Sequence, residues 1–320
     1  MKAYYLAEAD RVSEKVLEYK NCFKFAAVAD SHIDNSISDT FSNIKAVDKK
    51  VDFKCLVHLG DFLNGNLPRH YTKAVLKDQM DGFQGSINGK DFYPVQGNHD
   101  GFKILTATGG ASSNIALDED WHEATAFVDL YKNVSRPGNK PYFFVDYPED
   151  MVRMIVLCNF FYEGGSYKKK FGIDTEQLKW IKDVAVDIGE GWTVMIFSHD
   201  LPIKSLNEDV CEENSKINGI IAMDIIKEAC NKNKFDFAGW FIGHTHGDYI
   251  GKAGGINFIL VASETAYIPQ LWDMPEGGYY PDRELNTVSE DLWDCVVLDK
   301  QNRKIKIFRF GAGKDREIDY

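Results

Sequence analysis

An apolar run that ends in Gly-His-Thr-His constrains the fold of this chain more than any other part of its sequence. Residues Ala238 to Ile242 are all apolar or small, which is typical of an inner strand of a sheet covered on both faces. Gly243 lets the backbone leave the strand in a tight turn. His244 and His246 then follow at the strand's C-terminal edge, where open α/β sheets place their ligand sites. Two imidazoles that point the same way are either half of a metal site or a pair of surface histidines.

Four other apolar runs end in turns that carry the same kind of side chain. Helical spacing of apolar residues separates the first three runs, which predicts parallel strands joined by right-handed crossovers. Each turn repeats the strand-end geometry of the histidine pair. The runs cover residues 22–29, 53–59, 91–96 and 192–197, and their turns carry Asp30 and His32, Asp61, Asn98 and His99, and His199.

These side chains offer hard oxygen and imidazole donors and no thiolate. Such a set suits Mn, Fe or Zn better than it suits a soft metal. Asp61 stands alone on its turn, and a carboxylate has enough lone pairs to bind two ions, so Asp61 is the natural bridge. The predicted cofactors are therefore two divalent metal ions.

The remaining pattern predicts a single domain over residues 22–320, with residues 1–21 as an N-terminal helix or arm packed on it. Residues 263–292 form a long segment that is either functional or a packed cover over a sheet edge. The apolar residues of the N-terminal helix are Val12, Val16, Leu17 and Tyr19. Strands at residues 141–146 and 151–159 form a hairpin that enters a second sheet, Asp174 caps a helix with Gln177 reaching back to it, and a second hairpin spans residues 292–310.

Charge and cysteine usage exclude several classes of protein. The formal net charge of −12 makes a nucleic-acid-binding surface unlikely to be the main feature, although an acidic pocket can hold divalent cations. The six cysteines are widely spread without a CxxC pair, which favours free thiols in a reducing compartment. The sequence shows no signal peptide and no apolar run that spans a bilayer, so we expect a cytoplasmic protein with no membrane span.

The segments DSH, GDFLN, GNHD, SH and GHTH, in this order, resemble the five blocks of the calcineurin-like metallophosphoesterases. Any one block is a weak signal, but five in sequence, each after an apolar run, are specific. The resemblance covers about residue 23 to residue 310. It implies an α/β fold, a four-layer α-β-β-α sandwich of two mixed sheets flanked by helices.

The resemblance also implies a role for each side chain. Asp61 would bridge two metal ions, and His99 would protonate the leaving group or stabilise the transition state. A hydroxide held between the ions would attack phosphorus directly, so that His99 and Asp61 are the predicted catalytic residues. The first ion would be held by Asp30, His32 and His246, and the second by Asn98, His199 and His244.

The sequence departs from the protein-phosphatase branch of this family. That branch continues its second block as GDxxDRG, whereas this chain has Asn64 where an aspartate would orient the histidine, and it lacks the arginine that clamps phosphate. We therefore expect His99 to be held less strongly as imidazolium, unless Asp100 substitutes for the missing carboxylate. The missing arginine argues against a phosphoprotein phosphatase and favours a phosphodiester over a phosphomonoester substrate.

Several interpretations stay open at this level. His58 is either a core histidine or a support for the site, and Asp200 either orients His199 or closes its turn. The alternative function is a binding or assembly module in which the phosphoesterase site is secondary. It is motivated by the N-terminal arm, by the aromatic and proline-rich residues 268–280, and by an ending that resembles phage-associated and bacterial surface proteins. The substrate, a phosphate-ester small molecule or polymer, and the oligomeric state are not specified.

Overall fold

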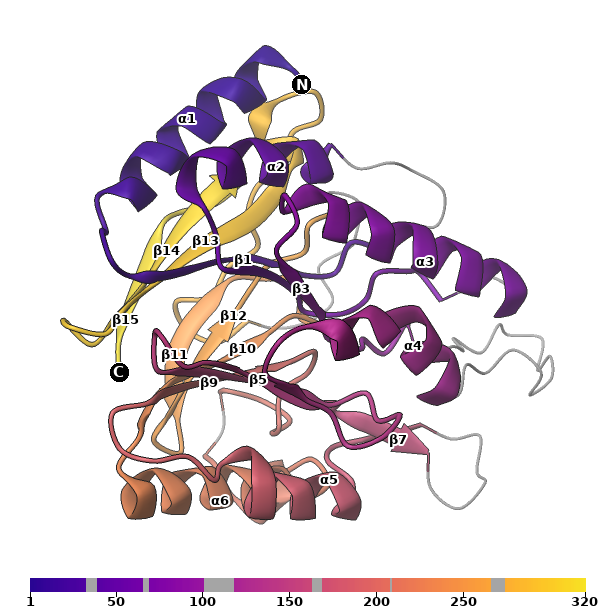
Figure 1. Ribbon diagram of the computed structural model, residues 1–320, viewed down its shortest axis with the longest axis vertical. Helices are drawn as coiled ribbons and strands as arrows, with labels where there is room; N and C mark the ends of the chain where they lie inside the picture. Colours follow the sequence, from indigo (N-terminus) through magenta and orange to yellow (C-terminus); the bar gives the residue numbers. More distant parts are fainter. Residues whose placement is uncertain (33–38, 66–68, 101–117, 163–168, 208, 266–273) are drawn as a thin grey trace.

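Two β-sheets pack face to face, and helices cover the outer face of each sheet (Figure 1). This arrangement confirms the predicted four-layer sandwich. The computed structural model describes residues 1–32, 39–65, 69–100, 118–162, 169–207, 209–265 and 274–320.

The first sheet has six strands in the order β15-β14-β13-β1-β2-β3. Strands β1, β2 and β3 run parallel, as the strand–helix–strand rhythm predicts, and β13 pairs antiparallel with β1. The predicted C-terminal hairpin is β13 and β14, and β15 is an additional edge strand that the pattern does not predict. The bounds are β1 Phe23–Val28, β2 Cys55–His58, β3 Asp91–Pro94, β13 Leu292–Asp299, β14 Lys304–Gly311 and β15 Arg316–Asp319.

The second sheet has seven strands in the order β11-β12-β10-β9-β6-β5-β4. Strand β10 lies between β12 and β9 and is parallel to both, which confirms the prediction of an inner strand. Strands β5 and β6 form the predicted antiparallel hairpin, and β11 is a strand that the pattern does not predict. The bounds are β4 Val134–Ser135, β5 Phe143–Tyr147, β6 Val152–Val156, β9 Thr193–Ser198, β10 Asp236–Ile242, β11 Tyr249–Ala253 and β12 Ile256–Leu260.

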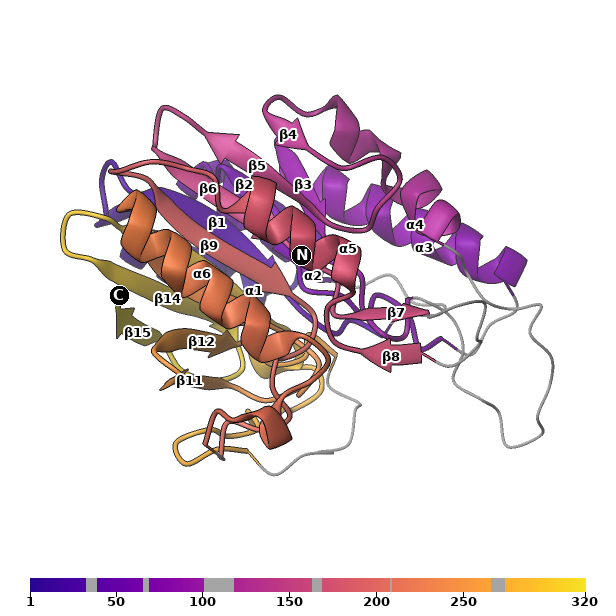
Figure 2. The same cartoon turned by 90° about the horizontal axis from the view of Figure 1, so that it is seen from below.

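Helices α1, α2 and α3 cover the first sheet, and α5 and α6 lie across the outer face of the second (Figure 2). Helix α4 packs beside α3. None of the helices in the described ranges combines the length and the hydropathy that crossing a bilayer requires. The bounds are α1 Ala3–Leu17, α2 Thr40–Val51, α3 Arg69–Ser86, α4 Asp118–Thr125, α5 Thr175–Trp180 with a π-turn over Ile181–Ala185, and α6 Gly219–Asn233. A separate two-stranded sheet consists of β7 Phe160–Tyr162 and β8 Lys169–Phe171.

An aromatic cluster fills the space between the sheets. Phe25 of β1 lies edge-on to Phe197 of β9 and Phe241 of β10, with ring centroids 5.7 and 5.6 Å away, and the last two rings stack at 5.1 Å. These rings are fully buried. The cluster therefore fixes strands of the two sheets against each other, a few residues before the turns that carry the predicted donors.

The start of α5 corrects one expectation. Asp174 caps the helix as predicted, because its Oδ1 accepts a hydrogen bond from the Gln177 backbone N–H at 2.6 Å. The Gln177 side chain does not reach back to Asp174. Instead it accepts from the backbone N–H of Cys158 at 2.9 Å and donates to the Cys158 carbonyl at 2.7 Å. Those two buried backbone groups lie beyond the end of β6 and need hydrogen-bond partners. The Gln177 side chain therefore bonds to them rather than to the N-terminus of its own helix.

Helix α1 is integrated into the core of the first layer. Tyr5, Ala9, Val12 and Val16 are buried together with side chains of the first sheet, whereas Leu17 is 44% exposed. The helix also contacts β14: Arg11 donates to the Arg309 carbonyl at 2.5 Å, and Glu8 accepts from the Gly311 N–H at 3.0 Å. These contacts join α1 to the C-terminal part of the first sheet.

Replacing Val12 by alanine should lower the free energy of unfolding by about 2 kcal/mol, because two buried methyl groups are lost and a cavity remains. The measurement is urea unfolding followed by tryptophan fluorescence. Leu17→Ala is the matched control on the same helix, and its effect should stay within about 0.5 kcal/mol because the side chain faces solvent. Equal effects of the two substitutions would contradict the packing described for α1.

The described part of the long segment before β13 is held by a single arginine. Arg283 donates to the backbone carbonyls of Ser263, Glu264, Ser289 and Glu290 at 2.5 to 2.8 Å. One guanidinium therefore ties both ends of the segment together. Residues 266–273, which include part of the proline-rich stretch, lie outside the described residues, as do residues 101–117.

Candidate metal centre

Seven predicted donor side chains converge from five turns at the C-terminal ends of β1, β2, β3, β9 and β10. Six of them fall into two groups, within each of which the donor atoms lie within 4.8 Å of one another: Asp30 with His32 and His246, and Asp61 with His199 and His244. Each group takes side chains from both sheets, because β1 and β2 belong to the first sheet and β9 and β10 to the second. The convergence places all seven residues in one site.

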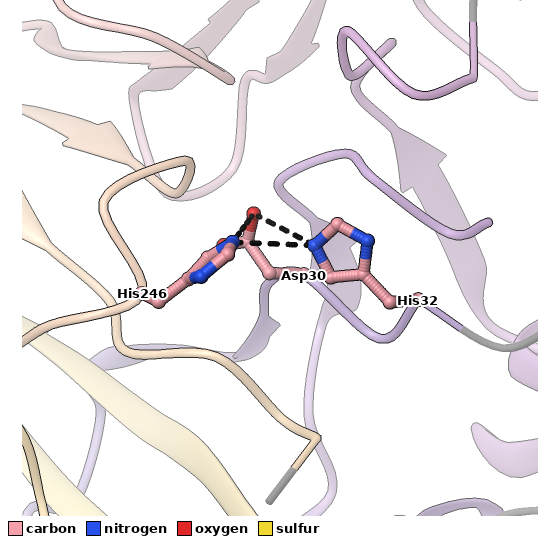
Figure 3. Close-up of side chains that lie close together, drawn as sticks. All are labelled: Asp30, His32 and His246. Atoms are coloured by element: carbon pink, nitrogen blue, oxygen red, sulfur yellow. Dashed lines mark hydrogen bonds and ion pairs between the residues drawn. The ribbon is translucent and has the colours of Figure 1, made fainter. Parts of the chain in front are cut away.

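The first group has three side chains that point toward one another (Figure 3). The Nε2 atoms of His32 and His246 are 3.2 Å apart. Asp30 Oδ1 lies 3.6 Å from His246 Nε2 and 3.9 Å from His32 Nε2. Three donor atoms at these separations surround one point, as the ligands of a single ion do.

The second group uses different imidazole nitrogens. His199 presents Nε2, His244 presents Nδ1, and these two atoms are 3.2 Å apart. Asn98 Oδ1 lies 2.9 Å from His199 Nε2, which adds the predicted amide donor to the group. The Nδ1 of His199 faces the Leu59 carbonyl at 2.7 Å, so this nitrogen carries the proton and Nε2 is the donor atom.

Asp61 lies between the two groups. Its Oδ2 is 3.2 Å from His199 Nε2 and 3.8 Å from His32 Nε2. Asp61 is fully buried and therefore cannot be solvated by bulk water. One carboxylate within reach of both donor groups has the position that a bridging ligand requires.

Five of the donor residues adopt left-handed backbone conformation, which is uncommon for residues other than glycine. Such conformations cost of order 1–3 kcal/mol each and persist where the surrounding structure enforces them, often at functional sites. Here they turn each side chain back over the end of its strand. The φ values are 54° for Asp30, 47° for His32, 57° for Asp61, 63° for His244 and 59° for His246.

Two glycines and one aspartate hold the neighbouring turns together. A Cβ at Gly60, whose φ is 95°, would lie 2.7 Å from the backbone N of Gly97, so the two turns approach too closely for any side chain. The Asp100 carboxylate accepts from the backbone N–H groups of Gly97, Asp61 and Phe62, each at 2.8 Å. Asp100 thus fixes the turn that carries Asp61.

His99 corrects the expectation about its orienting partner. Its Nδ1 lies 2.7 Å from the backbone carbonyl of Asn64, so a carbonyl oxygen rather than a side-chain carboxylate accepts its proton. Asp100 binds backbone amides and does not substitute for the missing aspartate. The Nε2 of His99 faces Asp61 Oδ2 at 3.8 Å, and its side chain is 23% exposed, the most open of the site histidines.

The position of His99 is compatible with two roles in the site. Its ring meets that of His32 edge-on at 4.8 Å, and its donor atoms also lie within 4.8 Å of those of His32 and Asp61. A ligand role and a proton-donating role are therefore both compatible with its position.

His58 supports two turns of the site at once. It is fully buried, its Nδ1 accepts from the Gly60 N–H at 3.1 Å, and its Nε2 lies 2.8 Å from the Ser31 hydroxyl. Because Nδ1 accepts, the neutral ring carries its proton on Nε2 and donates it to Ser31. The ring also stacks on Phe62 at 3.7 Å. Of the two interpretations of His58, the structure favours a support for the site.

Asp200 closes its own turn. Its Oδ1 accepts from the Leu201 N–H at 2.8 Å, and its Oδ2 pairs with the ammonium of Lys216. The partner of His199 Nδ1 is Leu59, not Asp200, whereas Asp200 Oδ1 lies 3.9 Å from His244 Nε2. Lys216 could not be identified from the sequence, since it lies 16 residues from Asp200 and in no motif.

Burial keeps three of the donor histidines neutral. It lowers the pKa of His32 and His244 to about 4 and that of His246 to about 3, so each offers a lone pair at neutral pH. Burial also opposes the charged form of His199, but the Asp61 carboxylate outweighs it and raises the pKa of His199 to about 10. Burial would raise the pKa of Asp61 as well, yet His199 and its neighbouring histidines hold that pKa below its ordinary value.

This donor set fits a pair of divalent metal ions. Within the described ranges, the ion-pair partners of Asp30 and Asp61 are histidines and include no lysine or arginine. Two buried carboxylates of this kind need positive charge close by. Divalent ions would supply it and would displace the proton from His199, because imidazole binds a metal in its neutral form.

Comparisons with known proteins agree with the fold and the motif order. A family model described as calcineurin-like phosphoesterase matches residues 23–248, a range that contains all the predicted donors. No curated protein matches the chain.

Two solved structures share the fold over most of their length. A dimetal phosphatase from Danio rerio has a TM-score of 0.57 and 14% identity, over 93% of this chain and 99% of that one. A structure titled PhoD has a TM-score of 0.54 and 10% identity, over 91% of this chain and 68% of that one. At such identities the likeness concerns the fold alone.

Proposed function

Since this chain belongs to the calcineurin-like phosphoesterase family and is thereby a metal-dependent phosphoester hydrolase, we propose that it cleaves a phosphodiester or phosphomonoester at a dinuclear centre. In this proposal, Asp30, His32 and His246 hold one ion, and Asn98, His199 and His244 hold the other. Asp61 bridges the two. The observation that carries the proposal is the position of Asp61 Oδ2, within 4 Å of a histidine from each group.

Two bound divalent ions would neutralise charge on the phosphoryl group and make a water nucleophile available near neutral pH. The chain's own residues supply the remaining requirements. The buried turns exclude bulk water from Asp30, Asp61 and His199, which strengthens every electrostatic interaction in the site. Hydrolysis adds water across the P–O bond, so the departing alkoxide must gain a proton.

His99 is placed to deliver that proton. Its Nδ1–H is held by the Asn64 carbonyl, and the more exposed Nε2 side faces the site. As imidazolium, the ring would donate from Nε2, which lies 3.8 Å from Asp61 Oδ2, to the leaving oxygen. We therefore assign His99 the role of general acid in this proposal.

The test is hydrolysis of bis-p-nitrophenyl phosphate and p-nitrophenyl phosphate by protein freed of metal with chelator and then supplied with Mn²⁺. We expect hydrolysis that depends on the added metal, with the diester cleaved faster because the chain lacks the phosphate-clamping arginine of the protein-phosphatase branch. Repeating the assay with Zn²⁺ and Fe²⁺ identifies the preferred metal. Metal-independent rates, or no hydrolysis of either ester, would contradict the proposal.

The setting of the protein is a further part of the proposal. All six cysteines are free, and three of them are buried. Unpaired thiols suit a reducing compartment, which supports a cytoplasmic location. The substrate is proposed to be a small or polymeric phosphate ester rather than duplex nucleic acid, in view of the net charge of −12.

A further inference from the structure

A buried ionic cluster lies directly beyond the second histidine of the GHTH turn. It consists of Asp248, Asp294, Arg309 and Arg316, which we call the Asp248 cluster. Asp248, Asp294 and Arg309 are at most 1% exposed. Asp248 is two residues after His246, whereas the other three belong to β13, β14 and β15, outside the range that the family model matches.

The cluster joins the GHTH turn to the C-terminal strands. Asp248 Oδ1 lies 2.6 Å from Arg309 Nη2 and 2.7 Å from Arg316 Nη1. The same two arginines pair with Asp294, at 2.9 Å and 2.5 Å. Two positive and two negative charges balance within this cluster, so none of the four is left as an isolated buried charge.

The loop around Asp248 is held through its backbone as well. The N–H and carbonyl of Asp248 pair with the carbonyl and N–H of Tyr279, at 2.8 and 3.0 Å. Asp248 Oδ1 also accepts from the Ala262 N–H at 3.2 Å. Asp248 is therefore fixed from several directions, and the residues before it are fixed with it.

His246 needs such an anchor more than His199 and His99 do. A metal-binding histidine is normally oriented by a hydrogen bond from its second ring nitrogen. His199 and His99 have this bond, to the carbonyls of Leu59 and Asn64. In contrast, Nδ1 of His246 is buried and has no hydrogen-bond partner among the described residues. The orientation of this ring therefore depends on the backbone that carries it.

His244, on the same turn, is anchored independently. Its backbone N–H donates to both carboxylate oxygens of Asp30, at 3.0 and 3.1 Å, and Gly243 donates to the His199 carbonyl at 3.1 Å. Loss of the Asp248 anchor should consequently displace His246 while His244 stays in place.

We propose that Asp248, held by Arg309 and Arg316, is a positioning residue that keeps His246 aligned with Asp30 and His32. The role rests on the proposed function, because it supposes that this group binds one of two ions. Asp248 acts through the backbone and does not touch substrate or metal. The C-terminal strands β14 and β15 would in this way contribute to a site whose donors all lie earlier in the chain.

The test compares two charge-balanced double variants. Asp248→Asn with Arg309→Met removes one buried ion pair of the cluster and leaves Arg316 with Asp294. Asp146→Asn with Arg153→Met is the matched control, because it removes a partly buried pair with two contacts of 2.7 Å in the β5–β6 hairpin, which contributes no donor to either metal group. Mn²⁺ binding to chelator-treated protein is followed by electron paramagnetic resonance, and urea unfolding reports whether each variant is folded.

The parent and the control should each bind two Mn²⁺ ions and show the signal of a coupled pair. The Asp248 variant should keep one binding step and lose about 10- to 100-fold in affinity for the other, the range found when partners that orient metal ligands are replaced. Arg309→Lys, which keeps the charge, is measured alongside in case the double variant does not fold. It should weaken the same step, since an ammonium cannot pair with Asp248 and Asp294 in the guanidinium's fork geometry.

Three results would overturn the inference or its premise, and they differ from one another. Unchanged binding of both ions by the folded variants would show that the Asp248 cluster does not position His246. Equal weakening in the control would show that the effect reflects general stability. A parent protein that binds no Mn²⁺ would instead refute the proposed function, whatever the variants do.

Discussion

Asp61→Asn should lower the rate of phosphoester hydrolysis at least about 100-fold, since even partners that only orient metal ligands change affinity or activity 10- to 100-fold. Asparagine nearly preserves the shape of the side chain but removes the negative charge and one of the two carboxylate oxygens, of which Oδ2 faces both His199 and His32. The pair of ions should then no longer bind together. The measurements are the rate with bis-p-nitrophenyl phosphate at saturating Mn²⁺ and the number of ions bound.

Asp48→Asn is the control for this substitution. Asp48 is a buried aspartate of α2 whose partners, Asn88 and Lys90, lie on the connection from α3 to β3. The same chemical change there should leave the hydrolysis rate close to that of the parent. An Asp61→Asn protein that hydrolyses at the parent rate would remove the basis of the proposed mechanism.

His99→Ala should lower kcat by about 10²- to 10⁴-fold for esters with poor leaving groups, the usual contribution of general acid catalysis. The effect should be far smaller for p-nitrophenyl esters, because p-nitrophenolate leaves without being protonated. Comparing an alkyl diester with bis-p-nitrophenyl phosphate therefore isolates the proton transfer. His122→Ala is the control, since His122 pairs with Asp129 through Nε2 at 3.0 Å, away from the site.

Metal content decides between the two roles that the position of His99 allows. A proton donor can be removed without loss of metal, so the His99→Ala protein should bind two ions as the parent does. Loss of an ion, together with equal rate reductions for both kinds of ester, would identify His99 as a ligand beside His32 and Asp61.

The sequence locates the side chains that converge in this site because each motif follows an apolar run. The signal is local, because a polar residue at the end of an apolar run marks Asp30, Asp61, Asn98, His199 and His244. The order of their motifs along the chain then indicates the fold. The same apolar runs predict the strands that precede these side chains. The roles of the individual donors stay predictions until metal binding is measured.

The supports of the site could not be predicted, because they depend on contacts between distant segments. The carbonyl of Asn64 replaces a side-chain carboxylate as the partner of His99, and a backbone group carries no sequence signature. The position of Gln177 fits a capping pattern, but its side chain hydrogen-bonds to the backbone N–H and carbonyl of Cys158 instead. Arg309 lies 61 residues from Asp248, in a hairpin whose apolar pattern describes only its packing.

Each donor group draws side chains from both sheets, and this has a consequence for the molecule as a whole. A bound ion would cross-link the two layers at one end of the sandwich, in addition to the aromatic rings that join them along the strands. Ions that bind only the assembled protein stabilise it by mass action. Depletion of the metal would then lower the free energy of unfolding as well as the rate of hydrolysis.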